Sequence, residues 1–407
     1  MGVRAYRWWL VSQVLSASGG MTQAVAQSWL VLHLTHSAFL LALTTTATFT
    51  PLLLGSAWAG SLTDRFDRRR ALVVTQSAYI VLGVALGALV LDGDVRVWML
   101  FAFAFANGCI SAVDSPTRQV FVLELVGADY VASAIGLNEV VINASRVLGP
   151  ALGGVLLATV GFAACFFVNA ASYLPPLGVV IALLWRRGWA HRRATGEDRG
   201  PGRVRRGLAF AWRRPAIRYS MLMAVAAGML FNLGATLPLI ATRAFHMGAG
   251  GYGALTATFG GGAVFGALLA GGGPSWPSGR RVRWLAVLTG ACVCLTAASP
   301  WVGLVFAGLA LAGFLSIWFI ALANALVQLR TEPGLRGRVM GIWTMALPGT
   351  TPVTSLIVGG VATWAGGAAG ARDAFGLSGA ALLLTAALAW RSLSDRGDPA
   401  RSPAAKL

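Results

Sequence analysis

The chain has 407 residues, of which 57% are hydrophobic and only 11% are charged. A soluble domain of average composition is about 45–50% apolar and about 25% charged. A water-soluble fold has no room to bury so much apolar surface. The composition therefore excludes a soluble enzyme, a coiled coil and a disordered chain, and it predicts an all-α protein that crosses a membrane several times.

Twelve apolar segments are each long enough to cross a bilayer, which takes about 20 residues. We expect membrane helices near residues 8–33, 38–62, 71–91, 97–116, 133–157, 161–185, 217–242, 252–272, 283–299, 301–325, 339–365 and 373–392. The fold class that follows is a twelve-helix membrane protein.

Charge sets the expected orientation of these helices. The 32 basic and 14 acidic residues give a net charge of +18. All but four of the basic residues fall at the two chain ends or in the even-numbered loops; the four exceptions are Arg96, Arg243 and Arg372 in odd-numbered loops and Arg146 within a helix. Because cytoplasmic loops carry the excess of arginine and lysine, both termini are expected in the cytoplasm. This pattern favours membrane topology over nucleic-acid binding.

One long polar segment divides the chain. We expect a six-helix bundle over residues 1–186, a basic cytoplasmic linker over 187–216, a second six-helix bundle over 217–392 and a disordered cytoplasmic tail over 393–407. The two halves also repeat a pattern after their second helices, because Gly60 precedes the pair Arg68-Arg69 by the same separation as Gly272 precedes Arg280-Arg281. A duplicated six-helix unit with a site between the halves at mid-bilayer is a known transporter architecture.

Two motifs carry a family resemblance. Gly60-x-x-x-Asp64-Arg65-x-x-Arg68-Arg69 resembles the loop 2–3 signature of the major facilitator superfamily, and Gly149-Pro150-Ala151-Leu152-Gly153-Gly154 resembles the core of its antiporter signature. The run from Pro116 to Val126, with Arg146 ahead of the Gly-Pro pair, is similar to the branch that holds the enterobactin exporter and macrolide efflux proteins. The resemblance implies proton-coupled efflux of a hydrophobic or amphipathic compound, such as a drug, a macrolide or a siderophore-like metabolite, by alternating access.

The resemblance also implies roles for these motifs. The loop residues Gly60, Asp64, Arg65, Arg68 and Arg69 would latch the two halves together when the cytoplasmic side is closed; a plain topology-setting loop is the alternative. The helix 5 residues Gly149, Pro150, Gly153 and Gly154 would give a kinked helix that restricts leakage, because proline breaks the hydrogen-bond ladder and glycine permits close packing. Asp67 departs from the superfamily pattern, which usually has glycine there.

Helix 5 also carries ionisable groups inside a membrane span. Glu139, Asn143 and Arg146 are spaced 4 and 3 residues apart and so share one face. A charge in that position costs about 2.5–3.5 kcal/mol and needs a partner or a wet cavity. We expect Glu139 to carry the coupling proton in a polar cavity between helices 4 and 5, lined on helix 4 by Asn107 and Asp114. Glu139 and Arg146 lie about 10 Å apart along the axis, so Asn143 would bridge them or Asp114 would partner one of them. A structural ion pair is the alternative.

Neutral polar residues supply candidate substrate contacts, which suit a large and mostly uncharged ligand. They are Gln23, Gln27, Asn169, Asn232 and Asn324. Hydrogen bonds between helices are the competing interpretation.

The chain lacks a phosphate-binding loop, a metal-ligand spacing and a nucleophile elbow, so we expect no enzyme activity, no cofactor and no metal site. The four cysteines sit in apolar runs and are expected to be inert thiols. The expected partners are a small molecule, protons and membrane lipid, with the chain a monomer in the plasma membrane. A solute importer, a lysolipid flippase and a non-transporting receptor or scaffold stay open as alternatives.

Overall fold

The computed structural model describes residues 2–63, 67–126, 131–184, 210–271, 278–332, 339–340, 342–343, 346, 349–390 and 392–393. All regular structure in this part of the chain is helical. The helices of the first half are α1 (Gly2–Thr35), α2 (Ala38–Thr63), α3 (Arg68–Leu91), α4 (Val97–Val126), α5 (Val131–Thr159), α6 (Phe162–Ser172) and α7 (Leu174–Leu184). Those of the second half are α9 (Pro215–Leu230), α10 (Leu233–Leu239), η2 (Ile240–Ala244, a π-helix), α11 (Ala249–Gly271), α12 (Gly279–Ala298), α13 (Val302–Leu329), α15 (Thr351–Trp364) and α16 (Gly367–Leu388).

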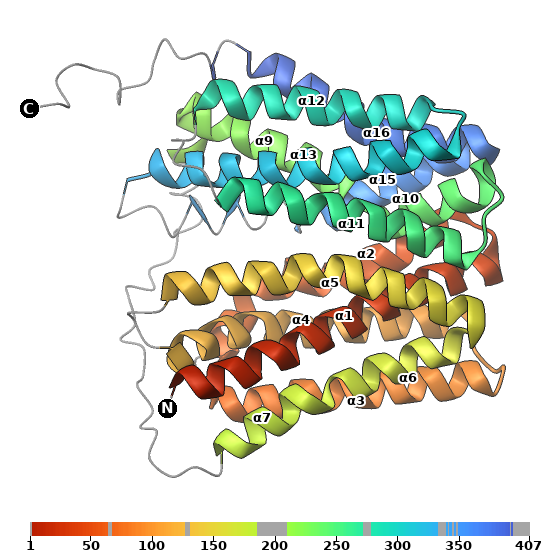
Figure 1. Cartoon of the computed structure of the whole chain (residues 1–407), viewed down its shortest axis with the longest axis vertical. Coiled ribbons are helices and arrows are strands. Elements are labelled where there is room, and N and C mark those ends of the chain that lie inside the picture. Colours follow the sequence, from red (N-terminus) through yellow and green to blue (C-terminus); the bar gives the residue numbers. More distant parts are fainter. Residues whose placement is uncertain are drawn as a thin grey trace, which may run out of the picture.

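The helices form two groups that lie side by side. Helices α1 to α7 gather in the lower part of Figure 1 and helices α9 to α16 in the upper part. Helix α1 begins and α16 ends at the same end of the molecule, which we call the proximal end. The opposite end, where α1 turns into α2 at residues 35–38 and η2 into α11 at residues 244–249, is the distal end.

Eight helices of the described residues are long and apolar enough to cross a membrane, or nine if the bent pair formed by Pro215–Leu230 and Leu233–Ala244 counts as one span. Helix α1 is not among them. Its polar side chains at positions 12, 13, 16, 22, 23 and 27 lower its hydropathy, and all six are buried against neighbouring helices. Twelve crossings and the cytoplasmic position of the termini remain predictions.

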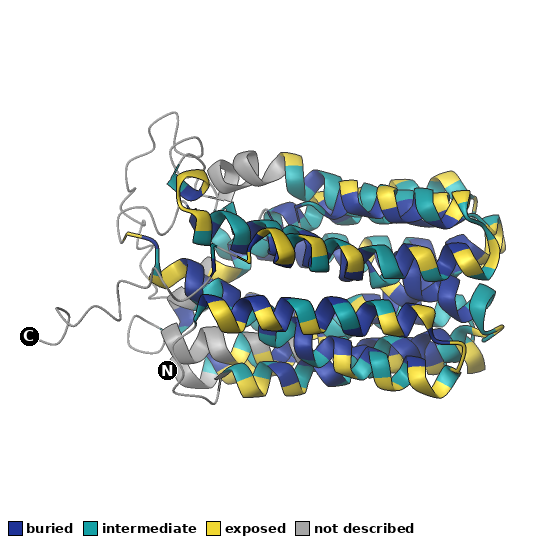
Figure 2. Ribbon diagram, turned by 90° about the horizontal axis from the view of Figure 1, so that it is seen from above, coloured by how far each residue is buried: buried dark blue, intermediate teal, exposed yellow. Residues whose placement is uncertain are grey.

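The surface is apolar where it would meet lipid. Large hydrophobic side chains are exposed along the outer faces of the helices, with Val81, Leu295 and Leu304 each more than half exposed. Figure 2 shows the complementary pattern, in which buried residues line the faces that helices turn to one another. Only a lipid environment accepts such a surface.

Two expected helices are not regular throughout. The span expected at 161–185 is present as Phe162–Leu184, with a one-residue interruption at Tyr173 between α6 and α7, where Pro175 and Pro176 have no N–H to continue the ladder. The span expected at 217–242 bends by 42° between Leu230 and Leu233. At that bend the last turn tightens, since the N–H of Asn232 bonds the carbonyl of Met229.

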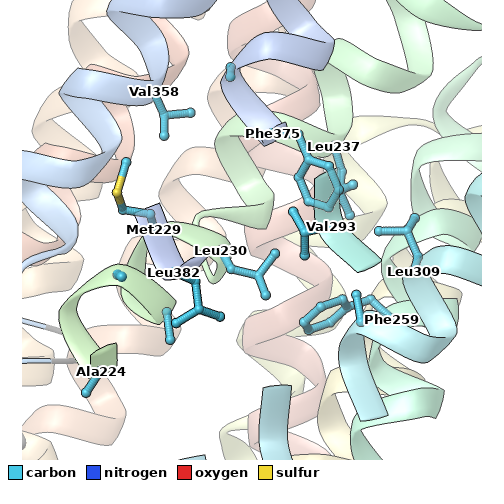
Figure 3. Close-up of a cluster of buried hydrophobic side chains, with 14 of the residues drawn as sticks. Ala224, Met229, Leu230, Leu237, Phe259, Val293, Leu309, Val358, Phe375 and Leu382 are labelled. Atoms are coloured by element: carbon cyan, nitrogen blue, oxygen red, sulfur yellow. The ribbon is translucent and has the colours of Figure 1, made fainter. Parts of the chain in front are cut away.

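Interdigitated side chains hold the second half together. Leu237, Phe259, Val293, Leu309 and Phe375 come from five different helices, are all fully buried, and converge on one another in Figure 3. This core fixes α10 against α11, α12, α13 and α16. The second half therefore carries its bent first helix on a rigid support.

Candidate functional site

A buried ion pair lies in the first half. Arg118 and Asp114 of α4 form a salt bridge one helical turn apart. The Asp114 carboxylate also accepts hydrogen bonds from Thr75 Oγ1 (2.7 Å) and Gln76 Nε2 (2.8 Å) of α3. Arg118 Nη1 donates to Gln13 Oε1 of α1 at 2.6 Å. Three helices thus share one polar network.

Two stacked tyrosines extend this network towards the break between α6 and α7. The rings of Tyr79 and Tyr173 lie 4.5 Å apart with an interplanar angle of 13°. The partners of Asp114 among the described residues are thus Thr75 and Gln76 of α3 and Arg118 of its own helix. Asn107, on the same helix as Asp114, is half-buried.

The polar residues of α1 bond to neighbouring helices of the same half. Gln23 Oε1 accepts from Asn169 Nδ2 of α6 at 2.5 Å. Gln27 Nε2 donates to the carbonyl of Leu100 in α4 at 3.2 Å. All three side chains are at most 9% exposed. These contacts agree with the interhelical interpretation of Gln23, Gln27 and Asn169, while the buried Oδ1 of Asn169 has no partner in the described residues.

The two candidates of the second half differ in their surroundings. Asn232, at the bend between α9 and α10, donates from Nδ2 to Thr354 Oγ1 of α15 at 2.8 Å, while its buried Oδ1 has no partner in the described residues. Asn324 accepts from Gln328 of its own helix at 2.6 Å. Asn232 thus joins two helices of the second half, whereas the bond of Asn324 stays within α13.

Arg146 of α5 reaches the other half. Its guanidinium lies 5.7 Å from the centroid of the Phe231 ring, at the bend of the second half's first helix. This distance is within the range of a cation–π contact. Four residues on, Pro150 has no N–H, so the carbonyl of Arg146 lacks its usual intrahelical donor. A Cβ at Gly260 of α11 would collide with that carbonyl.

The glycines of the helix 5 motif face two different neighbours. A Cβ at Gly149 would collide with Met21 of α1, and one at Gly153 would lie 3.3 Å from the carbonyl of Thr22. The Thr22 hydroxyl donates to the carbonyl of Gly149 at 2.9 Å. Gly154 faces the other way, since a Cβ there would lie 3.0 Å from the Cα of Gly253 in α11. The motif therefore lets α5 pack closely against α1 and against the second half at once.

Helices α2 and α15 form a second contact between the halves. The Thr46 hydroxyl lies 3.1 Å from the carbonyl oxygen of Pro352 and 3.2 Å from the Ser355 hydroxyl. Nearer the distal end, a Cβ at Gly359 would collide with Ala42 and lie 3.2 Å from the carbonyl of Ala38. The two halves thus meet along two pairs of closely packed helices.

At the proximal end, arginines cap the last helices of both halves. Asp67 caps α3 by accepting from the N–H of Arg69 at 2.9 Å, and Arg69 Nη1 donates to the carbonyl of Leu183 at the end of α7 at 2.9 Å. In the second half Arg283 Nη1 donates to the carbonyl of Trp390 at 2.7 Å. A cation at a helix C-terminus is stabilised by the helix dipole.

The surroundings of several expected site residues are not described by the structure. Asp64 and Arg65 lie outside the described residues. For Gly60, Glu139 and Asn143 the structure describes only the helix on which each residue lies. Arg68 begins α3. The latch and the proton site therefore stay predictions.

The sequence contains a local signal for the buried ion pair. An acid and a base four residues apart on a helix are neighbours, so the spacing of Asp114 and Arg118 indicates a pair. The partners on α3 and α1 have no such local signal. In the part of the chain that the structure describes, no group of three or more histidine, cysteine, aspartate or glutamate residues could hold a metal ion, and all four cysteines are free thiols.

Comparison with known proteins identifies the relatives of this chain. A protein-family model described as a transmembrane secretion effector matches residues 1–405. The multidrug efflux pump Tap of Mycobacterium tuberculosis (strain H37Rv) is 29% identical over 373 residues, which cover 88% of this chain and 87% of Tap. The staphyloferrin A transporter of Staphylococcus aureus is 28% identical over 168 residues, 41% of this chain, and the match spans only 42% of that transporter.

Solved structures show the same fold at low sequence identity. The nucleoside transporter NupG superposes with a TM-score of 0.71 at 10% identity, over 96% of this chain and 97% of that one. At this identity the likeness concerns the fold alone.

Proposed function

Because the chain belongs to the transmembrane secretion effector family of the major facilitator superfamily, we propose that it exports a hydrophobic or amphipathic compound in exchange for protons. The chain is a multi-pass transporter of the plasma membrane and not an enzyme. The resemblance to the superfamily is thereby confirmed. The cargo, the direction of transport and the coupling ion are our proposal, which the similarity to the multidrug efflux pump Tap supports.

The observation that carries the proposal is the position of Arg146. This arginine lies within an expected membrane span, is half-buried, and has its guanidinium beside Phe231 of the other half. A charge at that depth costs free energy that packing alone does not return, so it marks a functional path. A site at the junction between the halves is also where rocking of one half against the other alternates access.

We assign the coupling proton to Glu139, which lies on α5 two turns before Arg146. The described structure argues against Asp114 in this role. Its carboxylate already has three donors, from Thr75, Gln76 and Arg118, so a proton there would have to disrupt an ion pair and its network. A carboxylate held in this way is suited to joining helices.

The test is efflux of a fluorescent cationic dye from a drug-sensitive bacterial host that expresses the protein. We expect dye efflux that a proton uncoupler abolishes, and we expect Glu139→Gln to lose at least about tenfold in rate while folded protein stays in the membrane. Glu332→Gln is the matched control, because Glu332 is exposed and pairs with Arg214 outside the expected spans.

Each other result has a definite meaning. Full efflux by Glu139→Gln would exclude this acid as the proton carrier. Dye accumulation above the level of the empty host would indicate import. No change in dye level, repeated with a macrolide and a siderophore, would favour a lysolipid flippase or a scaffold over an exporter.

A further inference from the structure

A hydrogen bond joins the two halves at the distal end. Arg243, in the π-helix that ends the second half's bent first helix, donates from Nη2 to the carbonyl oxygen of His36 in the first half at 2.8 Å. The same guanidinium donates from Nη1 to the carbonyl of Ala362 in α15 at 3.5 Å. One cation therefore contacts two helices that belong to different halves.

Both acceptors lie at helix C-termini, where free carbonyl groups carry partial negative charge. His36 directly follows α1; its N–H bonds the carbonyl of Leu32, and its φ of 52° is the left-handed conformation that ends a helix. Ala362 lies in the last turn of α15, which ends at Trp364. Arg243 is thus placed to stabilise the distal ends of α1 and α15 together.

Close backbone contacts between the halves also lie towards the distal end. Gly154 approaches Gly253 between α5 and α11, and Gly359 approaches Ala38 between α2 and α15. These contacts are between backbone atoms, which cannot move aside as the end of a long side chain can. The hydrogen bond from Arg243 adds a charged contact between the halves at the same end.

The corresponding position in the first half is built differently. His36 and His246 end the first helices of the two halves with nearly the same backbone angle, φ 52° and 51°. Arg243 lies three residues before His246, and the residue three before His36 is His33. The His33 ring lies 5.9 Å from the ring of Phe162 in its own half. The second half therefore contacts the first through Arg243, whereas His33 has its ring contact within its own half.

We propose that Arg243 is a gating residue of the distal side. Its bond to the His36 carbonyl holds the distal ends of the two halves together, and this bond breaks each time the central site opens to that side. The arginine-rich proximal end is expected to face the cytoplasm, so Arg243 would act at the side opposite the loop 2–3 latch. The inference rests on alternating access, and it requires neither the assigned proton carrier nor the assigned cargo.

The test is a distance measurement between spin labels on the two halves. Val160→Cys and Trp301→Cys place labels at exposed positions of distal turns, one in each half, in a background where the four native cysteines are replaced by alanine. Pulsed electron paramagnetic resonance on the protein in lipid nanodiscs then gives the populations of short and long distances between the two labels. The measurement is made without substrate and without a pH gradient.

We expect Arg243→Ala to raise the ratio of long to short distances by roughly three- to tenfold, because the loss of a charged hydrogen bond shifts a two-state equilibrium by about that factor when solvent partly screens it. Arg243→Lys should shift the ratio less, since a lysine keeps the charge but lacks the planar fork of donors. Arg96→Ala is the matched control: Arg96 is an exposed arginine of the distal end whose side chain makes no hydrogen bond with described residues.

An unchanged distance distribution in folded Arg243→Ala would overturn the proposal, and so would an equal shift in Arg96→Ala. Gel filtration and thermal melting establish folding. If Arg243→Ala is not recovered folded, the comparison is made on Arg243→Lys, where the absence of any shift would overturn the proposal in the same way. Because the distance measurement does not require transport, it can contradict the gating role of Arg243 while the efflux assay supports proton-coupled export. The opposite combination of results is equally possible.

Discussion

Gly154 of α5 and Gly253 of α11 pack backbone against backbone across the junction between the two halves. A Cβ on Gly253 would lie 2.6 Å from the Cα of Gly154 and 2.8 Å from the carbonyl oxygen of Pro150. The junction therefore has no room for a side chain at this point.

We predict that Gly253→Ala destabilises the close approach of α5 and α11. Overpacking of this kind costs about 1–3 kcal/mol. Because the added methyl group meets backbone atoms, which cannot turn aside, the helices must separate, and we expect a lower melting temperature and a several-fold loss of dye efflux. Gly261→Ala is the control on the same helix, since a Cβ there meets no atom within 4 Å. Equal effects of the two substitutions would contradict the packing argument.

The ion pair of α4 gives a second prediction. Asp114→Asn leaves the Arg118 charge without its carboxylate, and we expect a loss of about 3 kcal/mol in the free energy of unfolding. This value is at the lower end for buried pairs, because the Arg118 side chain is 25% exposed. The measurement is denaturant unfolding of the purified protein in detergent.

Removing both charges together should undo part of this loss. We expect the double variant Asp114→Leu, Arg118→Met to recover only part of the stability, because Thr75, Gln76 and Gln13 lose their partners, and to keep uncoupler-sensitive efflux, because the pair serves to join helices. A folded double variant that transports without proton coupling would instead make Asp114 the coupling acid.

The arginine at the proximal end of α12 gives a third prediction. Arg283 is 6% exposed, donates to the Trp390 carbonyl, and has its guanidinium 4.0 Å from the centroid of the Trp390 ring. We expect Arg283→Ala to cost about 1–2 kcal/mol of stability through the lost helix cap and cation–π contact. Arg281→Ala removes an exposed arginine of the same helix and should leave the melting temperature unchanged. If both variants melt like the parent, the cap contributes nothing.

The expected latch in the loop between α2 and α3 gives a fourth prediction. Asp64→Asn should slow transport without abolishing ligand binding, because the latch acts on the change between states and not on the site. Asp67→Asn is the neighbouring control, since asparagine caps a helix as well as aspartate does and the first turn of α3 should persist. A turnover equal to that of the parent in Asp64→Asn would mean that the loop serves topology alone.

The sequence predicts which polar residues share a helix face but not which groups they bond to. Their presence on shared faces is readable from spacing, because the period of a helix is fixed. Their partners are not readable. Gln23 bonds Asn169, 146 positions away along the chain, and Asn232 bonds Thr354, 122 positions away. Each pair depends on how whole helices pack, which no local pattern contains.

The continuity of the membrane helices was also beyond local patterns. Pro175 and Pro176 permit an interruption of the helix expected at 161–185 without requiring one, and the bend of the helix expected at 217–242 falls at residues 230–233, where the sequence has no proline. The surrounding packing settles the matter: Tyr173 stacks on Tyr79 at one break, and Phe231 lies beside Arg146 and Phe259 at the other.

The amino-acid sequence alone determined the membrane class, the helical composition, the arginine-rich side and the superfamily. Hydropathy, charge and short motifs are local properties, so they do not depend on how the helices pack. The tertiary structure alone decided that Thr75 and Gln76 bond to Asp114, that the helix 5 glycines contact two neighbouring helices, and that Arg243 bridges the halves. In an apolar surrounding a polar group bonds whichever partner packing brings within reach, and packing is a property of the whole fold.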